Sequence, residues 1–254
     1  MNHITLSQIT AVSALRDIRS SSKTTINYIN ECILNNKIQN KKIDILVPNK
    51  TKAYKDKLFK RHVAKNKIIK KSLITLSKNI SVTSPELTIV QLASRLNYFE
   101  LALLVLEFCG NYSIINDANT GFINDIMPLT SVIKIREFIN QYSKDFCPIK
   151  GLKNLKEILT FASDNSNSPM ESRLFIKLCG PKSKGLYGCK GLKLNSSVNV
   201  SNSASKIAGQ KIIIPDISNK SKKVAIEYDS AQFHENSETG QRDKRRRDAL
   251  VKDG

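Results

Sequence analysis

A chain of 254 residues with 40% hydrophobic residues is long enough to bury a core and too apolar to be intrinsically disordered. Its formal net charge is +19, and both halves of the chain are basic. Such a charge attracts polyanions without reading their sequence. Nucleic acid is therefore an expected partner, and a lysine-rich surface without a polyanionic partner is an equally weighted alternative.

The apolar runs and the cysteines predict a chain that does not enter a membrane. Residues 1–5 are polar and lack the apolar core of a signal peptide. The longest apolar stretch, residues 101–109, contains Glu107 and is too short to cross a bilayer. The five cysteines have no CxxC spacing, which argues against a zinc site and a disulfide framework. We expect a cytoplasmic protein without a membrane partner.

The first part of the chain, residues 1–163, predicts a mostly helical, basic domain with a few short strands. The expected helices are 6–19, 23–38, one starting at Ser84-Pro85-Glu86, one ending before Gly110, 131–143 and 152–163. The expected strands are 43–47, 72–76 and 80–83, and residues 51–61 are expected to form a loop or a lysine-rich helix. The very basic segment 37–71 is the best candidate here for non-specific nucleic-acid contact, with a solvated surface as the alternative.

The polar residues 164–168 predict a linker to a second unit, residues 168–254. The second unit predicts the order helix, three strands, helix. The expected elements are a helix from Ser168 to about Cys179, strands at 193–200, 210–217 and 222–230, a loop at 232–240 and a helix at 241–253. The whole chain is thus expected to be a mixed α/β (α+β) protein.

Three carboxylates are expected to meet in this second unit. Asp216 follows an apolar run, and Glu227 and Asp229 follow the next one. A turn at 218–222 would bring Asp216 close to Glu227, and Glu227 and Asp229 share a strand face. Converging carboxylates need a positive partner, for which Mg²⁺ or Mn²⁺ is suited. Acids on the wet face of a half-exposed hairpin are the alternative.

Pro215-Asp216 followed by Glu227-x-Asp229 resembles the motif of the PD-(D/E)XK nucleases. Residues 168–254 are similar to the group related to the very-short-patch-repair endonucleases. The further elements that carry this resemblance are Pro169-Met170-Glu171, His234, and Asp243-x-x-Arg246-x-x-x-Leu250-x-x-x-Gly254.

The resemblance implies a restriction-endonuclease-like αβββα core and metal-dependent hydrolysis of phosphodiester bonds, with DNA as the expected substrate. It implies that Asp216 and Glu227 are metal ligands and that Glu171 holds the metal directly or through water. It also implies catalytic roles for Asp229 and His234. The last strand of such a core is absent from the chain, so a truncated domain is expected.

Several of these residues have a second interpretation. Asp229 stands where the motif has lysine, and Lys244 or Arg246 could supply the missing charge. Glu171 forms a capping-box pattern with Ser168, which could explain both residues structurally. His234 could be a solvent-exposed loop residue rather than a general base.

The last helix carries a basic cluster that could grip backbone phosphates. Its members are Arg242, Lys244, Arg245, Arg246 and Arg247. Alternatively, Arg246 pairs with Asp243 and the other side chains form a solvated surface.

The first part of the chain is similar to the N-terminal region of bacterial proteins found near abortive-infection (AbiEi-type) antitoxins. The resemblance rests on 43–47, His62, 82–88 and Leu92-Ala93, with Leu87 where the pattern usually has arginine. It implies a phage-defence or mobile-element setting with a toxin–antitoxin type of protein partner. The first functional hypothesis is a magnesium-dependent endonuclease. The alternatives are a catalytically inactive nucleic-acid-binding or antitoxin-like protein, and a protein-interaction module; the oligomeric state is not predicted.

Overall fold

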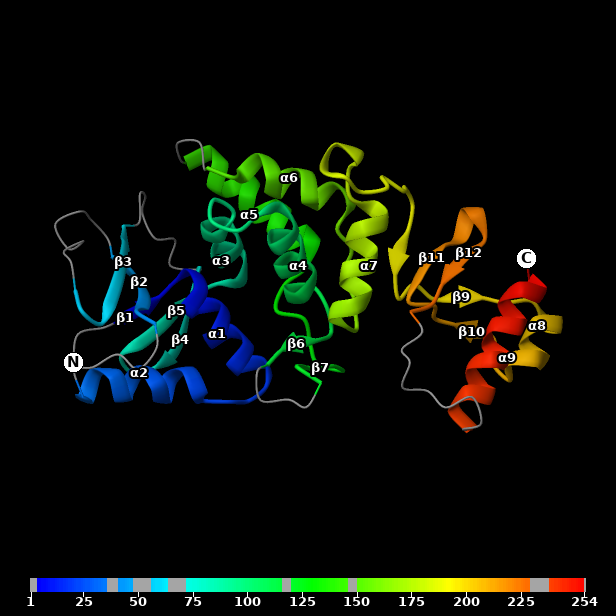
Figure 1. Cartoon of the computed structure of the whole chain (residues 1–254), viewed down its shortest axis with the longest axis horizontal. Coiled ribbons are helices and arrows are strands. Elements are labelled where there is room, and N and C mark those ends of the chain that lie inside the picture. Colours follow the sequence, from blue (N-terminus) through cyan, green and yellow to red (C-terminus); the bar gives the residue numbers. More distant parts are fainter. Residues whose placement is uncertain are drawn as a thin grey trace.

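The computed structural model describes residues 4–35, 41–47, 56–63, 72–115, 120–145, 150–228 and 238–253. Figure 1 shows an elongated molecule, with a sheet at the N-terminal end, a group of helices in the middle and a smaller sheet with two helices at the C-terminal end. The mixed α/β class predicted from the sequence is confirmed. Within the described ranges, no helix is both long enough and apolar enough to cross a membrane.

A mixed five-stranded sheet with the strand order β3-β2-β1-β5-β4 forms the N-terminal end. Its strands are β1 (Ile4–Leu6), β2 (Ile43–Val47), β3 (Phe59–Val63), β4 (Leu73–Ser77) and β5 (Ile80–Thr83). The central strand β1 runs parallel to β5 and antiparallel to β2, and Leu6 lies opposite both Ile45 and Val82. These three side chains are buried, so the apolar run of each strand explains its place in the sheet.

Strand β3 corrects the prediction of a loop or helix over residues 51–61. Residues 59–63 pair in parallel register with β2, from Ile43 opposite Phe59 to Val47 opposite Val63. Residues 51–55 lie outside the described residues. Pairing with a buried neighbouring strand outweighs the weak local preference of the lysine-rich segment.

Helices α1 (Gln8–Arg19), α2 (Thr24–Asn35) and α3 (Pro85–Leu92) accompany the sheet, and α4 (Tyr98–Phe108) follows α3. The predicted start of α3 is confirmed, because the Ser84 side chain accepts a hydrogen bond from the Leu87 N–H. Asn97 and Glu100 form a reciprocal capping box at the start of α4.

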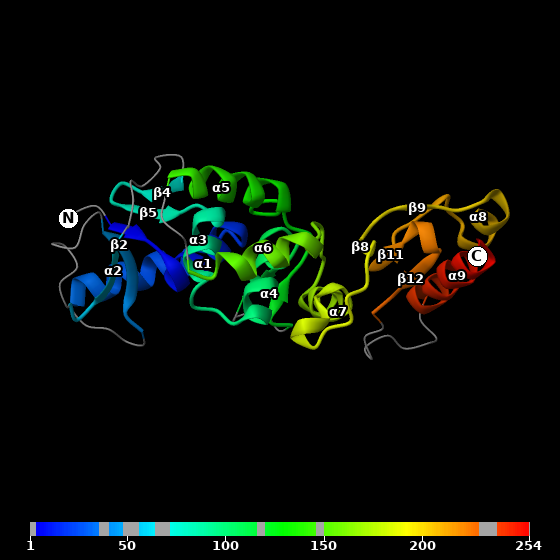
Figure 2. The same ribbon diagram turned by 90° about the horizontal axis from the view of Figure 1, so that it is seen from above.

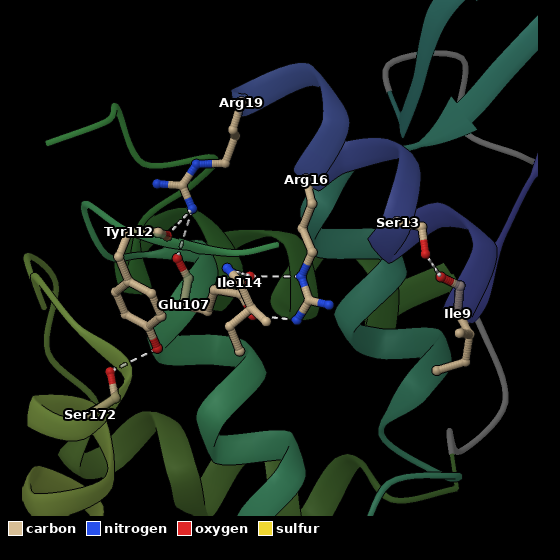
Figure 3. Close-up of polar contacts among 8 residues, drawn as sticks. All are labelled: Ile9, Ser13, Arg16, Arg19, Glu107, Tyr112, Ile114 and Ser172. Carbon is tan, nitrogen blue, oxygen red and sulfur yellow. Dashed lines mark hydrogen bonds and ion pairs between the residues drawn. The ribbon is translucent and has the colours of Figure 1, made fainter. Parts of the chain in front are cut away.

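Two arginines of α1 hold the C-terminal end of α4 (Figure 3). Arg16 makes two hydrogen bonds to the buried carboxylate of Glu107, at 2.8 and 2.7 Å. Arg19 donates to the carbonyl oxygens of Glu107, Tyr112 and Gly110 at 3.1, 2.6 and 2.7 Å. The Arg19 contacts thus add side-chain donors to carbonyl groups at and just beyond the end of α4, where intrahelical donors run out.

Helices α5 (Val132–Asp145), α6 (Leu152–Phe161) and α7 (Pro169–Cys179) complete the middle of the molecule, and the short strands β6 (Ser113–Ile114) and β7 (Phe122–Ile123) pair beside α4. Figure 2 shows α7 between the helical group and the C-terminal sheet. Helix α7 contacts α4, and its residues Phe175 and Ile176 belong to the same hydrophobic core as the N-terminal helices.

The polar segment 164–168 is not an exposed linker. Ser166 is fully buried, and its carbonyl accepts a hydrogen bond from Asn111 N–H at 2.7 Å. The Asp164 carboxylate accepts a hydrogen bond from Val132 N–H at 2.9 Å. The packing therefore continues through this segment into α7, and the division of the chain into two units stays a prediction.

The C-terminal part contains more elements than the three predicted strands and final helix. They are β8 (Lys193–Leu194), β9 (Val198–Asn199), α8 (Asn202–Ala208), β10 (Ile212–Ile213), β11 (Ile217–Asn219), β12 (Val224–Ile226) and α9 (Glu238–Asp253), with 3₁₀ turns at Lys182–Lys184 and Lys220–Lys222. The strands form an antiparallel sheet β12-β11-β8 and a separate pair β10-β9.

Helix α8 and the interrupted strands correct the predicted strands 193–200 and 210–217. The first breaks at Asn195, which adopts a positive φ of 44°. The second divides into β10 and β11 around Pro215, which has no N–H for a ladder. Ser201 caps α8 through Ala204 N–H, and Gly209 ends it in the left-handed conformation. The restriction-endonuclease-like arrangement stays a prediction.

Candidate active site around Asp216

The hairpin β11–β12 brings Asp216 and Glu227 together, as predicted, although Ser218 and Asn219 lie in β11 rather than in the turn expected at 218–222. Ile217 lies opposite Ile226, so the residues just outside this pair, Asp216 and Glu227, also face each other. The Asp216 N–H donates a hydrogen bond to Glu227 Oε2 at 3.4 Å, and the Tyr228 N–H donates to Asp216 Oδ2 at 2.7 Å. The backbone of one strand end therefore orients the carboxylate of the other.

Glu171 approaches this pair from the first turn of α7. Its N–H donates to Ser168 Oγ at 3.1 Å, so the predicted serine cap is confirmed. Its carboxylate accepts hydrogen bonds from Asn167 N–H at 3.0 Å and from Asn195 Nδ2 at 2.8 Å. Glu171 therefore takes part in the cap of α7 and also lies beside the candidate site.

Asn195 links Glu171 to Asp216, and the sequence interpretation missed it. Its side-chain amide donates to Glu171, and its backbone N–H donates to the Asp216 carbonyl at 2.9 Å. Asparagine tolerates the left-handed backbone that Asn195 adopts, and this conformation interrupts the strand at this point. An asparagine in the middle of an expected strand was the available signal.

Arg246 is the member of the predicted basic cluster that turns toward the site. Its Nη2 lies 3.5 Å from Glu227 Oε1 and donates to the Ile214 carbonyl at 2.9 Å. Its Nη1 also reaches Asp243 Oδ1 at 3.3 Å, so the predicted i,i+3 pair is confirmed. The other members of the predicted cluster are exposed on α9: Arg242, Lys244, Arg245 and Arg247.

The three acidic side chains influence one another. Burial raises the pKa of the Glu227 carboxyl, the charge of Asp216 raises it further, and Arg246 opposes both. Burial likewise raises the pKa of Glu171, and the charge of Asp216 adds to this effect against the hydrogen bonds from Asn167 and Asn195. Negative charge is therefore concentrated where a cation would be stabilised.

We expect the stability of the folded chain to fall as pH rises through the pKa values of Glu171 and Glu227. Both lie above the ordinary 4.5, so the folded chain keeps these protons after the unfolded chain has released them. The favourable contribution is complete below the unfolded pKa and is lost above the folded one. Urea titrations at about pH 5 and about pH 7 measure the free energy of unfolding, which should fall less between these pH values for Glu227→Gln than for the wild type.

The exposed Glu137 on α5 provides the matched control for this titration. Glu137→Gln should keep the pH dependence of the wild type. Equal pH dependence in Glu227→Gln and Glu137→Gln would contradict the perturbed titration of Glu227.

Two predicted catalytic residues, Asp229 and His234, lie outside the described residues. In the described ranges, no group of three or more His, Cys, Asp or Glu side chains is placed to hold a metal ion. The predicted cluster of three carboxylates thus stays a prediction. Asp216 and Glu227 alone still fit Mg²⁺, which is commonly held by one or two carboxylates, with water and phosphate as the other ligands.

Comparisons with known proteins add no family to this geometry. No protein-family model matches the chain, and neither the curated proteins nor the solved structures contain a match to it.

Proposed function

We propose that this chain is a divalent-cation-dependent nuclease in which Asp216 and Glu227 hold Mg²⁺ or Mn²⁺ and DNA is the substrate. The observation that carries the proposal is the hairpin register that sets these two carboxylates face to face. Burial raises the pKa of Glu227 and the charge of Asp216 raises it further, so the two carboxylates are close enough to repel each other.

Glu171 and Asn195 have positioning roles in this proposal. The Asn195 amide fixes the Glu171 carboxylate, while the Asn195 N–H holds the backbone of Asp216. In this proposal Glu171 would orient a water molecule, while Asp216 and Glu227 hold the cation. A bound divalent cation would lower the pKa of an attacking water and stabilise charge on the phosphoryl group.

Arg246 takes the part of the lysine that Asp229 replaces in the motif. Its guanidinium is held by Ile214 and Asp243 while it reaches Glu227, so its charge is oriented before a substrate arrives. A fixed cation next to the scissile phosphate would stabilise the negative charge of the transition state.

The ion pair between Arg246 and Glu227 favours a second candidate function. With Arg246 close to Glu227, the guanidinium partly neutralises the acids without a metal. The chain would then be a nucleic-acid-binding protein that retains the site without cutting, and the exposed cations of α9 would contact phosphates. An antitoxin-like role fits this candidate.

A cleavage assay separates the two candidates. Plasmid and single-stranded DNA are incubated with the wild type and with Asp216→Asn, in Mg²⁺, in Mn²⁺ and in a chelator. Cleavage by the wild type alone, lost in the chelator, would support the nuclease. Equal DNA binding by both proteins without cleavage in either metal would favour the second candidate.

A further inference from the structure

A groove of about 1070 Å³ opens beside the candidate active site. Its walls are the end of α6, the loop that follows α6, the end of α7 and residues 188–197. Asn195 is one of the lining residues, and its amide contacts Glu171 at 2.8 Å. The groove therefore adjoins the residues assigned to catalysis.

Two lysines of this groove form no salt bridge with the part of the chain that the structure describes. Lys190 and Lys193 line it, and both are exposed. One acid of the lining, Asp164, is engaged by the backbone, because its carboxylate accepts the Val132 N–H at 2.9 Å.

Asn219 joins the turn at 220–222 to the backbone of Lys190. The Asn219 side chain donates from Nδ2 to the Lys190 carbonyl at 3.1 Å and accepts the Lys222 N–H at 3.1 Å through Oδ1. Gly191 lets Asn219 approach, because a Cβ on this glycine would lie only 3.0 Å from Asn219 Nδ2. The exposed Lys220 and Lys222 thus extend the positive edge that begins at Lys190.

We propose that this groove binds a single-stranded segment of nucleic acid and leads it toward Asp216 and Glu227. That the strand leads toward Asp216 and Glu227 rests on the proposed function, whereas binding of the strand in the groove does not. The groove volume lies just above the ~300–1,000 Å³ typical of ligand pockets, a size that suits a few nucleotides of one strand. Lys190 and Lys193 would meet phosphates, and Phe161 in the lining offers a ring for a base.

Binding can be measured separately from cleavage in the Asp216→Asn protein without divalent ions. Fluorescence anisotropy of a labelled single-stranded oligonucleotide compares K190E/K193E with K206E/K211E, whose exposed lysines give the same charge change away from the groove. We expect K190E/K193E to bind about tenfold or more weakly at moderate salt. Its slope of log affinity against log salt should fall by about 1.4, the value for two lost phosphate contacts to a single strand.

Equal weakening in the two double variants would overturn the proposal, as would tighter binding of a duplex with the same sequence. If K190E/K193E has a lower Tm than K206E/K211E, the neutral variant K190Q/K193Q is measured instead. Weaker oligonucleotide binding by K190Q/K193Q than by the control then supports the groove. Weaker binding by K190E/K193E, together with a wild type that does not cleave DNA, would support the groove and reject the nuclease. Cleavage by the wild type, together with unchanged binding by K190E/K193E, would support the nuclease and reject the groove.

Discussion

Asp216→Asn is expected to lower the rate of metal-dependent DNA cleavage by about 100-fold or more, since a metal ligand contributes several kcal/mol to the stabilisation of the transition state. Asparagine keeps an oxygen that can accept the Tyr228 N–H, a bond of 2.7 Å in the native hairpin. The hairpin should therefore survive while the negative charge is lost. Initial rates on supercoiled plasmid at a fixed Mg²⁺ concentration measure the effect.

Thermal unfolding gives a second measurement of the same substitution. A ligand that binds only the folded state stabilises it by about 1.4 kcal/mol at ten times its Kd. For a chain of this size, Mn²⁺ at ten times its Kd should raise the Tm of the wild type by about 3–6 °C and leave that of Asp216→Asn unchanged. Asp248→Asn, an exposed acid on α9, is the matched control and should behave as the wild type. Cleavage by Asp216→Asn at the control's rate would remove Asp216 from the mechanism.

The pairing of Asp216 with Glu227 was predictable because it depends on local sequence. A short turn after Asn219 joins β11 to β12, and the register of this hairpin sets the two acids opposite each other. Ile212 and Ile213, expected in the first strand of this hairpin, instead form β10 and pair with β9. The helix starts at Ser84 and Ser168 were equally local, since a cap involves only the next few residues.

The rest of the site depends on contacts that a local pattern does not specify. Asn195 reaches Glu171 across 24 positions of sequence, and its role depends on a left-handed backbone that breaks the expected strand. The segment 164–168 has the composition of a linker, yet Ser166 is buried because its backbone bonds to Asn111. Tertiary hydrogen bonds decided both cases against the local preference.

Glu107 is a core residue whose contacts are likewise not specified by the local sequence. In the sequence it interrupts an apolar stretch, but its side chain is only 2% exposed and is paired with Arg16 from a distant helix. It also accepts the Ile114 N–H at 3.1 Å, so it joins α1, α4 and β6 (Figure 3). An acid in the last turn of a helix is unfavourable on its own, which makes the cation from α1 necessary.

Arg16→Met is therefore expected to lower the free energy of unfolding by about 3–5 kcal/mol, because it leaves the buried Glu107 carboxylate without its partner. Glu107→Leu should cost less, since Arg16 is 27% exposed and can turn toward water. The double variant R16M/E107L should recover much of the loss, because an apolar pair replaces a buried ion pair at little cost. Urea unfolding of the four proteins measures the coupling, with the exposed Arg173→Met as a control that should change stability by less than about 0.5 kcal/mol. Additive losses in the double variant would show that the two side chains act independently, and that the ion pair does not hold α1 against α4.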